Sequence, residues 1–364
     1  MEMKEIARKN IKEIVPYEPG KPIKEVEREL GIKGIVKMAS NENPLGPSPK
    51  ALKAIRECLK DLNRYPDGGS FYLKERLAKE FGLEKKNFIL GNGSNEIIEL
   101  AIRTFMNEGD EVITAEPSFL IYKISVRIEG GKPVLVPLKD FAYDLPRMRE
   151  AVTERTKLVF IANPNNPTGT SVGKDELEKF LNGLPEGIIV ILDEAYNEFV
   201  ECKDFPNSLD YLNRGNVIIL RTFSKAHGLP GLRIGFGIAS TELIDLMNRT
   251  RQPFNVNSLA QAAALASLDD KAHVERIKKL VREGKEYLYK EFDSLGLFYQ
   301  KSDTNFILVD IKGDGRKVFE KMLREGVIIR DMNAYGLKNF IRVTIGTRKE
   351  NKKFISALKK VLIK

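Results

Sequence analysis

The chain has 364 residues, a length that favours two domains. Hydrophobic residues make up 42% of it and charged residues 30%, a composition that excludes an intrinsically disordered protein. Apolar runs such as residues 188–192 are too short to cross a bilayer, and the N-terminus has no apolar secretory core. The net charge of +9 comes from lysines interspersed with glutamates, as on solvated helix faces. We therefore expect a cytoplasmic protein that binds neither membranes nor nucleic acid. Two cysteines and two histidines are too few for a disulfide framework or a usual zinc site.

Residues 1–40 are predicted to form an N-terminal arm. The segment from Met3 to Ile14 has a helical pattern, and the prolines of VPYEPGKPIKEV keep the following residues extended.

Residues 41–250 alternate apolar runs, loops and amphipathic helices, one of which is expected at Ser94–Met106. Several of the runs are continuously apolar, as in strands that are covered on both faces. This pattern predicts a large α/β domain in which helices cover both faces of a mostly parallel central sheet. The predicted strands are 88–90, 111–114, 157–162, 187–192, 216–220 and 233–239.

Residues 251–364 are predicted to form a smaller α+β domain. It begins with a helical connection and a long charged helix. A strand at 304–310, a helix at 316–325, strands at 327–330 and 340–345 and a last helix follow.

Polar motifs follow the predicted strands, and in an open α/β sheet ligands bind beyond the carboxyl ends of the strands. They are GNGSNE, PSF, NPNNPTG, DEAY and RTFSK, in chain order. GNGSNE lacks the third glycine of a dinucleotide-binding loop. A glycine turn that leads into a helix at Ser94 and Asn95 still suits a phosphate, although a plain helix cap explains the motif equally well.

Asp193 and Lys225 are the two charged residues to explain. Asp193 ends an apolar strand, where a buried carboxylate needs a cationic partner such as a protonated pyridine nitrogen; a helix cap is the alternative. Tyr196 follows three residues later. A desolvated lysine at a sheet end can lose its proton and act as a nucleophile on a carbonyl. Near Lys225, Thr222 and Ser224 offer hydroxyl groups, and Arg233 can bind a phosphate. His227 is better explained as a structural residue.

Together with NENPLGPSP, NRYPD, SKAHGLPGLRIG and FIRVTIGT, these motifs resemble the fold-type-I pyridoxal-phosphate-dependent aminotransferases of class II. Within that fold type the chain is most similar to the histidinol-phosphate aminotransferases, from about Tyr17 to Arg348. The resemblance implies pyridoxal 5′-phosphate as cofactor and a homodimer with shared active sites.

By this resemblance, Lys225 binds the cofactor covalently and Asp193 pairs with its pyridine nitrogen. Asn163 and Tyr196 would contact its phenolic oxygen, and Phe119 would stack on its ring. The cofactor phosphate would be held by Ser94, Asn95, Thr222, Ser224 and Arg233, and by Tyr65 from the partner subunit.

The resemblance also implies the substrates. Arg342 would bind the substrate carboxylate, Arg330 and Tyr17 would surround the distal anionic group, and Asn43 and Asn163 would also contact substrate. The expected reaction transfers an amino group from a phosphorylated amine, histidinol phosphate, to 2-oxoglutarate in a ping-pong cycle. A threonine-phosphate decarboxylase and an aromatic or broad-range aminotransferase stay open as alternatives.

Overall fold

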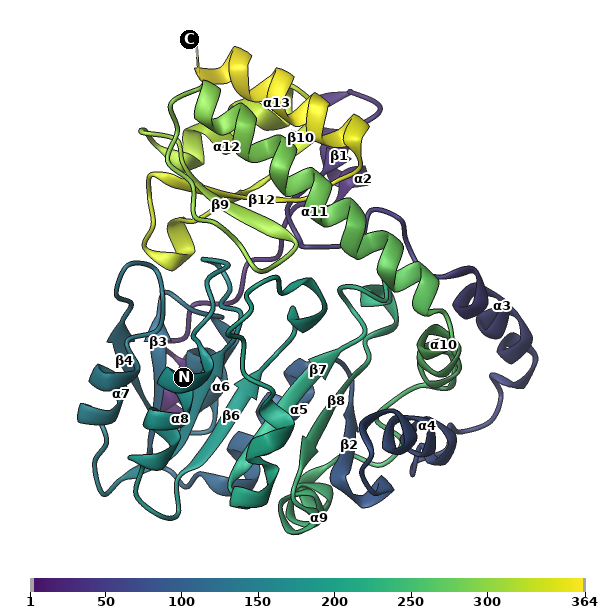
Figure 1. Cartoon of the computed structure of the whole chain (residues 1–364), viewed down its shortest axis with the longest axis vertical. Helices are drawn as coiled ribbons and strands as arrows, with labels where there is room; N and C mark the ends of the chain where they lie inside the picture. Colours follow the sequence, from purple (N-terminus) through teal and green to yellow (C-terminus); the bar gives the residue numbers. More distant parts are fainter. Residues whose placement is uncertain (1–2, 363–364) are drawn as a thin grey trace.

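A seven-stranded sheet forms the centre of the larger part of the molecule (Figure 1). The computed structural model describes residues 3–362. Six strands run in one direction, and β8 is antiparallel to both of its neighbours. This confirms the predicted α/β fold with a mostly parallel sheet. The spatial order is β2 (Phe88–Gly91), β8 (Gly235–Ala239), β7 (Val217–Thr222), β6 (Ile189–Asp193), β5 (Thr156–Ala162), β3 (Glu111–Glu116) and β4 (Lys132–Pro137).

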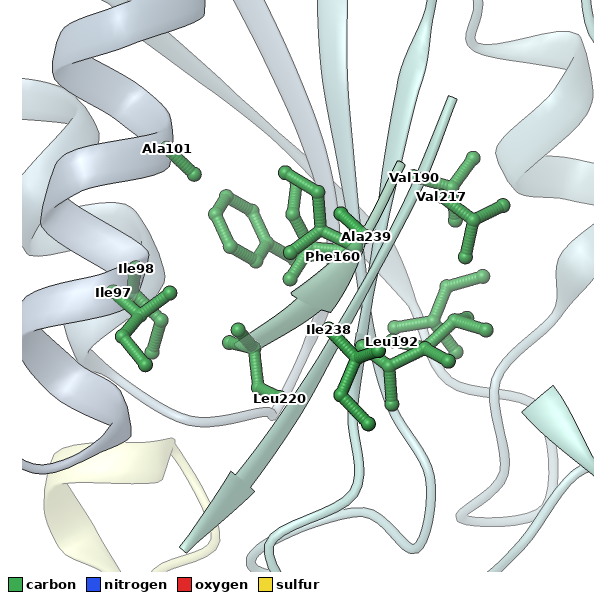
Figure 2. Packing of buried hydrophobic residues seen from close by; sticks show 14 of the residues in the cluster. Ile97, Ile98, Ala101, Phe160, Val190, Leu192, Val217, Leu220, Ile238 and Ala239 are labelled. Atoms are coloured by element: carbon green, nitrogen blue, oxygen red, sulfur yellow. The ribbon is translucent and has the colours of Figure 1, made fainter. Parts of the chain in front are cut away.

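Helices pack on this sheet and close its core. On one face, Ile97, Ile98 and Ala101 of α5 point toward Phe160 and Leu220 of the strands (Figure 2). Continuous apolar runs are needed here because the central strands are buried on both faces. The helices of this part are α3 (Pro49–Cys58), α4 (Phe71–Phe81), α5 (Ser94–Phe105), α6 (Ile121–Ile128), α7 (Leu145–Glu150), α8 (Lys174–Asn182), α9 (Thr241–Thr250) and α10 (Ser258–Leu268).

Strand β4 was not expected from the sequence. It carries Pro133 and Pro137, which cannot donate backbone hydrogen bonds. The strand lies at the edge of the sheet, where only one side needs to be paired, so prolines are tolerated there.

A smaller sheet, in the order β11 (Arg330–Asp331), β12 (Phe340–Thr344) and β9 (Phe306–Asp310), lies at the other end of the molecule (Figure 1). The predicted strand at 327–330 is divided, because β10 (Val327–Ile328) pairs with β1 (Val36–Lys37) instead. The arm thereby joins the second hydrophobic core, to which Val26 and Met38 contribute. The remaining helices are α2 (Ile23–Leu30), α11 (Lys271–Ser294), α12 (Gly315–Arg324) and α13 (Arg348–Leu362).

The helical connection links the two cores. Helix α10 packs on α3, and its residues up to Ala264 belong to the first core; α11 contributes to the second core from Ile277 onward. The expected boundary at residue 250 lies just before this connection.

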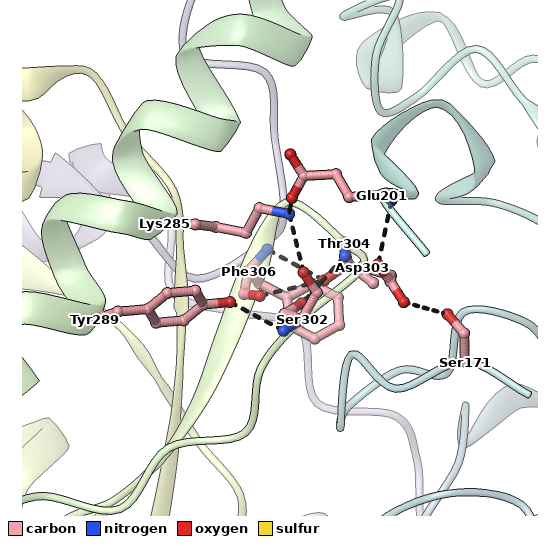
Figure 3. A network of polar contacts seen from close by, with 8 residues as sticks. All are labelled: Ser171, Glu201, Lys285, Tyr289, Ser302, Asp303, Thr304 and Phe306. Carbon is pink, nitrogen blue, oxygen red and sulfur yellow. Dashed lines mark hydrogen bonds and ion pairs between the residues drawn. The ribbon is translucent and has the colours of Figure 1, made fainter. Parts of the chain in front are cut away.

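A polar network also joins the two parts (Figure 3). The ammonium group of Lys285 in α11 lies 2.6 Å from a carboxylate oxygen of Glu201 and 2.9 Å from the carbonyl oxygen of Ser302. Asp303 accepts hydrogen bonds from the Ser171 hydroxyl at 2.8 Å and from the Glu201 backbone N–H at 3.2 Å. The network fixes the loop before β9 against the loops that follow β5 and β6.

The predicted N-terminal helix is shorter than expected. Its first turns are α1 (Met3–Ile6) and a separate 3₁₀ turn at Lys9–Ile11, while residues 1 and 2 of the arm lie outside the described residues. Ile6 and Ile11 are 62% and 37% exposed, so burial of these side chains does little to stabilise a longer helix. None of the helices within residues 3–362 combines the length and the apolar composition of a membrane span.

Candidate active site

A cavity of about 480 Å³ lies where the carboxyl ends of β3, β5, β6 and β7 meet. Because β8 is antiparallel, its amino end meets the same edge. The structure therefore brings together most of the side chains that the sequence singles out. Those that line the cavity are Tyr17, Ser94, Asn95, Phe119, Asp193, Tyr196, Thr222, Ser224, Lys225, Arg233, Arg330 and Arg342.

Lys225 lies in the loop after β7 with its amine in this cavity. The Nζ atom is 3.3 Å from the carbonyl oxygen of Ser40 and 5.6 Å from the centre of the Tyr196 ring. Burial, together with the positive charge of Arg342, lowers the pKa of Lys225 to about 8. None of the ion pairs within residues 3–362 involves this amine. Part of the Lys225 amine population is therefore unprotonated near pH 7 and can act as a nucleophile.

Asp193 is the last residue of β6 and is only 5% exposed. One carboxylate oxygen accepts a hydrogen bond from the Tyr122 hydroxyl at 2.7 Å, and the other accepts one from the Ala195 backbone N–H at 3.2 Å. Burial raises the pKa of Asp193 to about 6, although the Tyr122 hydrogen bond opposes this rise. A carboxylate held in this way suits a protonated ring nitrogen, whose charge would compensate for its burial.

Tyr196 presents a buried hydroxyl group to the same cavity. Its oxygen accepts a hydrogen bond from Asn41 Nδ2 at 2.8 Å. Burial raises the pKa of Tyr196 above its usual range, so the phenol keeps its proton and can donate it to a ligand.

A candidate phosphate site lies at the start of α5. Gly93 precedes the helix with no side-chain cap, which leaves the first backbone N–H groups at Ser94 and Asn95 for an anion. A side chain at position 93 would come within 2.6 Å of the Arg233 guanidinium, so glycine permits this close approach. Arg233 bonds only to the Pro230 carbonyl oxygen, at 3.2 Å, among the described residues.

Two further arginines come from the smaller sheet. Arg342 is buried; it donates one hydrogen bond to Oδ1 of Asn166 and another to the Ala39 carbonyl oxygen at 2.9 Å. Arg330 donates to the Glu18 carbonyl oxygen at 2.7 Å, and its guanidinium lies 5.8 Å from the centre of the Tyr17 ring. Within residues 3–362, neither arginine is paired with a carboxylate.

Two expected residues, Asn163 and Asn43, do not line the cavity, and neither does Tyr65, which is expected to reach the site of the partner subunit instead. The amide of Asn163 makes hydrogen bonds to the backbone of Val172, at 3.2 and 3.0 Å. The amide of Asn43 holds its own loop by bonding to the Ala226 carbonyl oxygen at 2.9 Å and the Leu45 N–H at 2.8 Å. Tyr65 is 82% exposed and stacks on Phe254, outside this cavity.

Conversely, Asn41, Tyr122 and Asn166 line the cavity, although the sequence reasoning did not select them. Asn166 belongs to NPNNPTG, where the pattern alone does not decide which asparagine points inward. Tyr122 stands three residues after Phe119, a spacing that places both on one side of a helical turn. This spacing from Phe119 could have indicated from the sequence that Tyr122 also lies at the site.

The described residues fit pyridoxal phosphate chemically. The phosphate would lie between Arg233 and the start of α5, the ring nitrogen would face Asp193, and the aldehyde would meet the Lys225 amine. Phe119 would supply an aromatic surface; its ring meets Tyr122 edge-on at 5.5 Å.

Known proteins are similar to this chain over nearly its whole length. Residues 33–358 match the family model described as aminotransferase class I and II. A histidinol-phosphate aminotransferase of Moorella thermoacetica is 51% identical over 357 residues, which cover 98% of this chain and 92% of that protein. One from Desulfotalea psychrophila is 49% identical, with 98% and 96% covered. The crystal structure of histidinol-phosphate aminotransferase from Sinorhizobium meliloti in complex with pyridoxal-5′-phosphate matches with a TM-score of 0.91 at 28% identity, covering 98% of both chains.

Proposed function

Because this chain belongs to the class I and II aminotransferases, we propose that it transfers the amino group of L-histidinol phosphate to 2-oxoglutarate. The products are imidazole acetol phosphate and L-glutamate, and the reaction is a step of histidine biosynthesis. The cofactor is pyridoxal 5′-phosphate.

One observation carries the choice of substrate. Arg233, Arg330 and Arg342 line a single cavity, and no carboxylate within residues 3–362 forms an ion pair with any of them. The reaction brings two or three anionic groups into the site: the cofactor phosphate, together with either the phosphate of the amino donor or the two carboxylates of glutamate. Guanidinium groups suit both phosphate and carboxylate because they donate two parallel hydrogen bonds.

The chain's residues divide the work as follows. Arg233, with Ser94, Asn95, Thr222 and Ser224, holds the cofactor phosphate, and Asp193 holds its ring nitrogen. Tyr196 and Asn166, which both line the cavity, would contact the phenolic oxygen, so that Asn166 would take the role expected of Asn163. When bound, the cofactor supplies a ring that withdraws electrons from the substrate carbon.

Lys225 moves the proton in this proposal. Its Nζ atom would take a proton from the substrate carbon that bears the amino group and would deliver it to the cofactor carbon that receives this group. Burial keeps part of the amine neutral near pH 7, as the first transfer requires. Arg330 and Tyr17 bind the distal phosphate, and Arg342 binds the carboxylate of glutamate when that substrate occupies the site.

We also propose a cytoplasmic homodimer. Apolar side chains between residues 45 and 72 are unusually exposed, and such surfaces mark protein interfaces. Tyr65 from the partner subunit would then reach the cofactor phosphate. The exposed members of this group are Leu45, Leu52, Leu59, Leu62, Tyr65, Phe71 and Tyr72.

A half-reaction tests the proposed activity. The holoprotein is mixed with histidinol phosphate, without an acceptor, and the cofactor absorbance is recorded. Conversion to the amine form of the cofactor, reversed by 2-oxoglutarate, is the expected result. Carbon dioxide release from threonine phosphate would instead indicate a decarboxylase, and equal turnover of phenylalanine or tyrosine would indicate an aromatic aminotransferase.

A further inference from the structure

Tyr122 makes a direct contact with the buried carboxylate of the site. It lies in the first turn of α6, is fully buried, and donates its hydroxyl proton to Asp193 Oδ2 at 2.7 Å. Among the hydrogen bonds of residues 3–362, this is the one that a side chain makes to Asp193; the other partner is the Ala195 backbone. The bond therefore determines where one of the two carboxylate oxygens points.

The Tyr122 ring is fixed by its aromatic neighbours. It stacks on Phe160 with centroids 4.6 Å apart and planes 14° from parallel. It also meets the edge of Phe119 at 5.5 Å and 85°. Aromatic contacts on two sides hold the hydroxyl group toward Asp193.

We propose that Tyr122 is a positioning residue that holds Asp193 in the orientation and ionised state needed to pair with the cofactor's ring nitrogen. This inference rests on the proposed function, since it assumes that pyridoxal phosphate occupies the cavity. A phenol donates a stronger hydrogen bond to a carboxylate than to a carboxylic acid, so the contact favours the charged form. Through its edge contact with Phe119, the same ring also supports the aromatic surface expected over the cofactor.

The other groups near Asp193 act in both directions. Burial and, to a smaller extent, the charge of Glu194 raise the pKa of Asp193, whereas the hydrogen bonds from Tyr122 and Ala195 and the charge of Lys225 lower it, with a net value of about 6. The phenols of Tyr143 and Tyr196 also lie within range of its charge. Removing the Tyr122 donor therefore raises this pKa above 6. The carboxyl group of the variant would be neutral, and unable to pair with a cation, over a wider pH range.

The test measures binding of pyridoxamine 5′-phosphate to the cofactor-free full chain by calorimetry, from about pH 5.5 to about pH 8. This probe keeps the ring nitrogen and the phosphate but has no aldehyde, so it forms no covalent bond with Lys225. Tyr122→Phe should bind roughly tenfold more weakly near pH 5.5, with a difference that shrinks to less than about twofold at pH 8. The acid limb of its affinity profile should shift upward by about one pH unit. The probe also titrates in this pH range, but this affects the unmodified protein and the variants equally and does not change the difference between them.

Tyr143→Phe is the matched control. Its hydroxyl is also buried at this sheet edge and makes hydrogen bonds, but to Ser118 at 2.7 Å and the Ala162 N–H at 3.1 Å. It should leave the acid limb in place. An unchanged profile for Tyr122→Phe, or an equal loss at every pH in both variants, would overturn the inference.

A second test compares the Asp193→Asn variant with the double variant Asp193→Asn, Tyr122→Phe. It does not rely on the Tyr122→Phe variant alone being correctly folded. If Tyr122 acts through the carboxylate, adding Tyr122→Phe to Asp193→Asn should change affinity less than about twofold. A further large loss would overturn the inference, because it would show a role for the hydroxyl apart from the carboxylate. Failure of the unmodified protein to bind the probe would instead overturn the proposed function, and the inference with it.

Discussion

Arg330 and Arg342 lie directly opposite each other in the antiparallel pair of β11 and β12. Like charges on facing positions repel, so this pair is unfavourable for folding alone. Hydrogen bonds to the Glu18 and Ala39 carbonyl oxygens and to Asn166 offset part of this cost. A bound anion would relieve the rest, and the pair is thus explained by ligand binding rather than by stability.

Arg330→Ala should therefore separate substrate binding from chemistry. We expect the KM for histidinol phosphate to rise about 10-fold to 100-fold, because a charged hydrogen-bonded contact is lost, with little change in kcat. For histidinol, the same amine without its phosphate, the KM should rise much less. Steady-state kinetics with both amines measures the difference.

Arg316→Ala is the control for this prediction. Arg316 is an exposed arginine that pairs with Glu320 and Asp331, outside the cavity. Its removal should leave both KM values unchanged. If Arg330→Ala raises the KM values for histidinol and for histidinol phosphate by the same factor, Arg330 does not bind the phosphate.

Lys225→Ala should abolish both turnover and the covalent attachment of the cofactor. The measurement is borohydride reduction of the loaded protein, followed by mass spectrometry of its peptides. In the unmodified protein the added mass should be found on Lys225. Lys74, whose pKa burial also lowers, lies outside the cavity and should stay unlabelled. Full activity in the alanine variant would remove Lys225 from the mechanism.

The sheet and the convergence of its polar loops were predictable from the sequence. Strand positions follow from short continuous apolar runs, a local signal. Once parallel strands are assumed, Asp193 and Lys225 must meet at one edge, because Asp193 directly follows one such run and Lys225 follows another within five residues. No knowledge of distant contacts is needed for that step.

What escaped prediction depends on distant parts of the chain. The turn at 163–171, which directs Asn166 rather than Asn163 into the cavity, is held by Asp303, 132 residues beyond Ser171. Strand β1 is only two residues long and exists because β10 pairs with it. Such contacts leave no periodic trace in the local sequence.

The buried carboxylate of Glu111 should make stability depend on pH. Thr153, Arg155 and Lys132 hold its pKa at about 2, below the ordinary value of 4.5. The contribution of this carboxylate to the free energy of unfolding is therefore complete above pH 4.5 and is lost as the pH falls toward 2. Glu111→Gln should cost about 2 kcal/mol at pH 7 and progressively less below pH 4.5, as urea unfolding would measure. The same change at exposed Glu186 should cost nothing at either pH; a pH-independent cost at Glu111 would contradict the linkage.

Lys285 should contribute more to stability than the surface lysines. Lys285→Met keeps most of the buried stem but removes the partner of Glu201 and Ser302, and we expect a loss of about 2 kcal/mol in the free energy of unfolding. Lys360→Met, which breaks an exposed pair with Glu325, should cost about 1 kcal/mol or less. Thermal unfolding of the two variants compares them. A similar small loss in both would mean that the network in Figure 3 adds little to stability.

Tyr65 provides a test of the shared active site. In the homodimer, a subunit with Lys225→Ala still offers its Tyr65 to the partner, and a subunit with Tyr65→Ala still has its own Lys225. Mixed dimers of the two variants therefore contain one intact site, which should restore activity at limiting cofactor that neither variant shows alone. Tyr72→Ala, at another exposed tyrosine on the same surface, is the control and should be active without mixing. If mixing restores nothing although sedimentation shows that mixed dimers form, Tyr65 does not act across the interface.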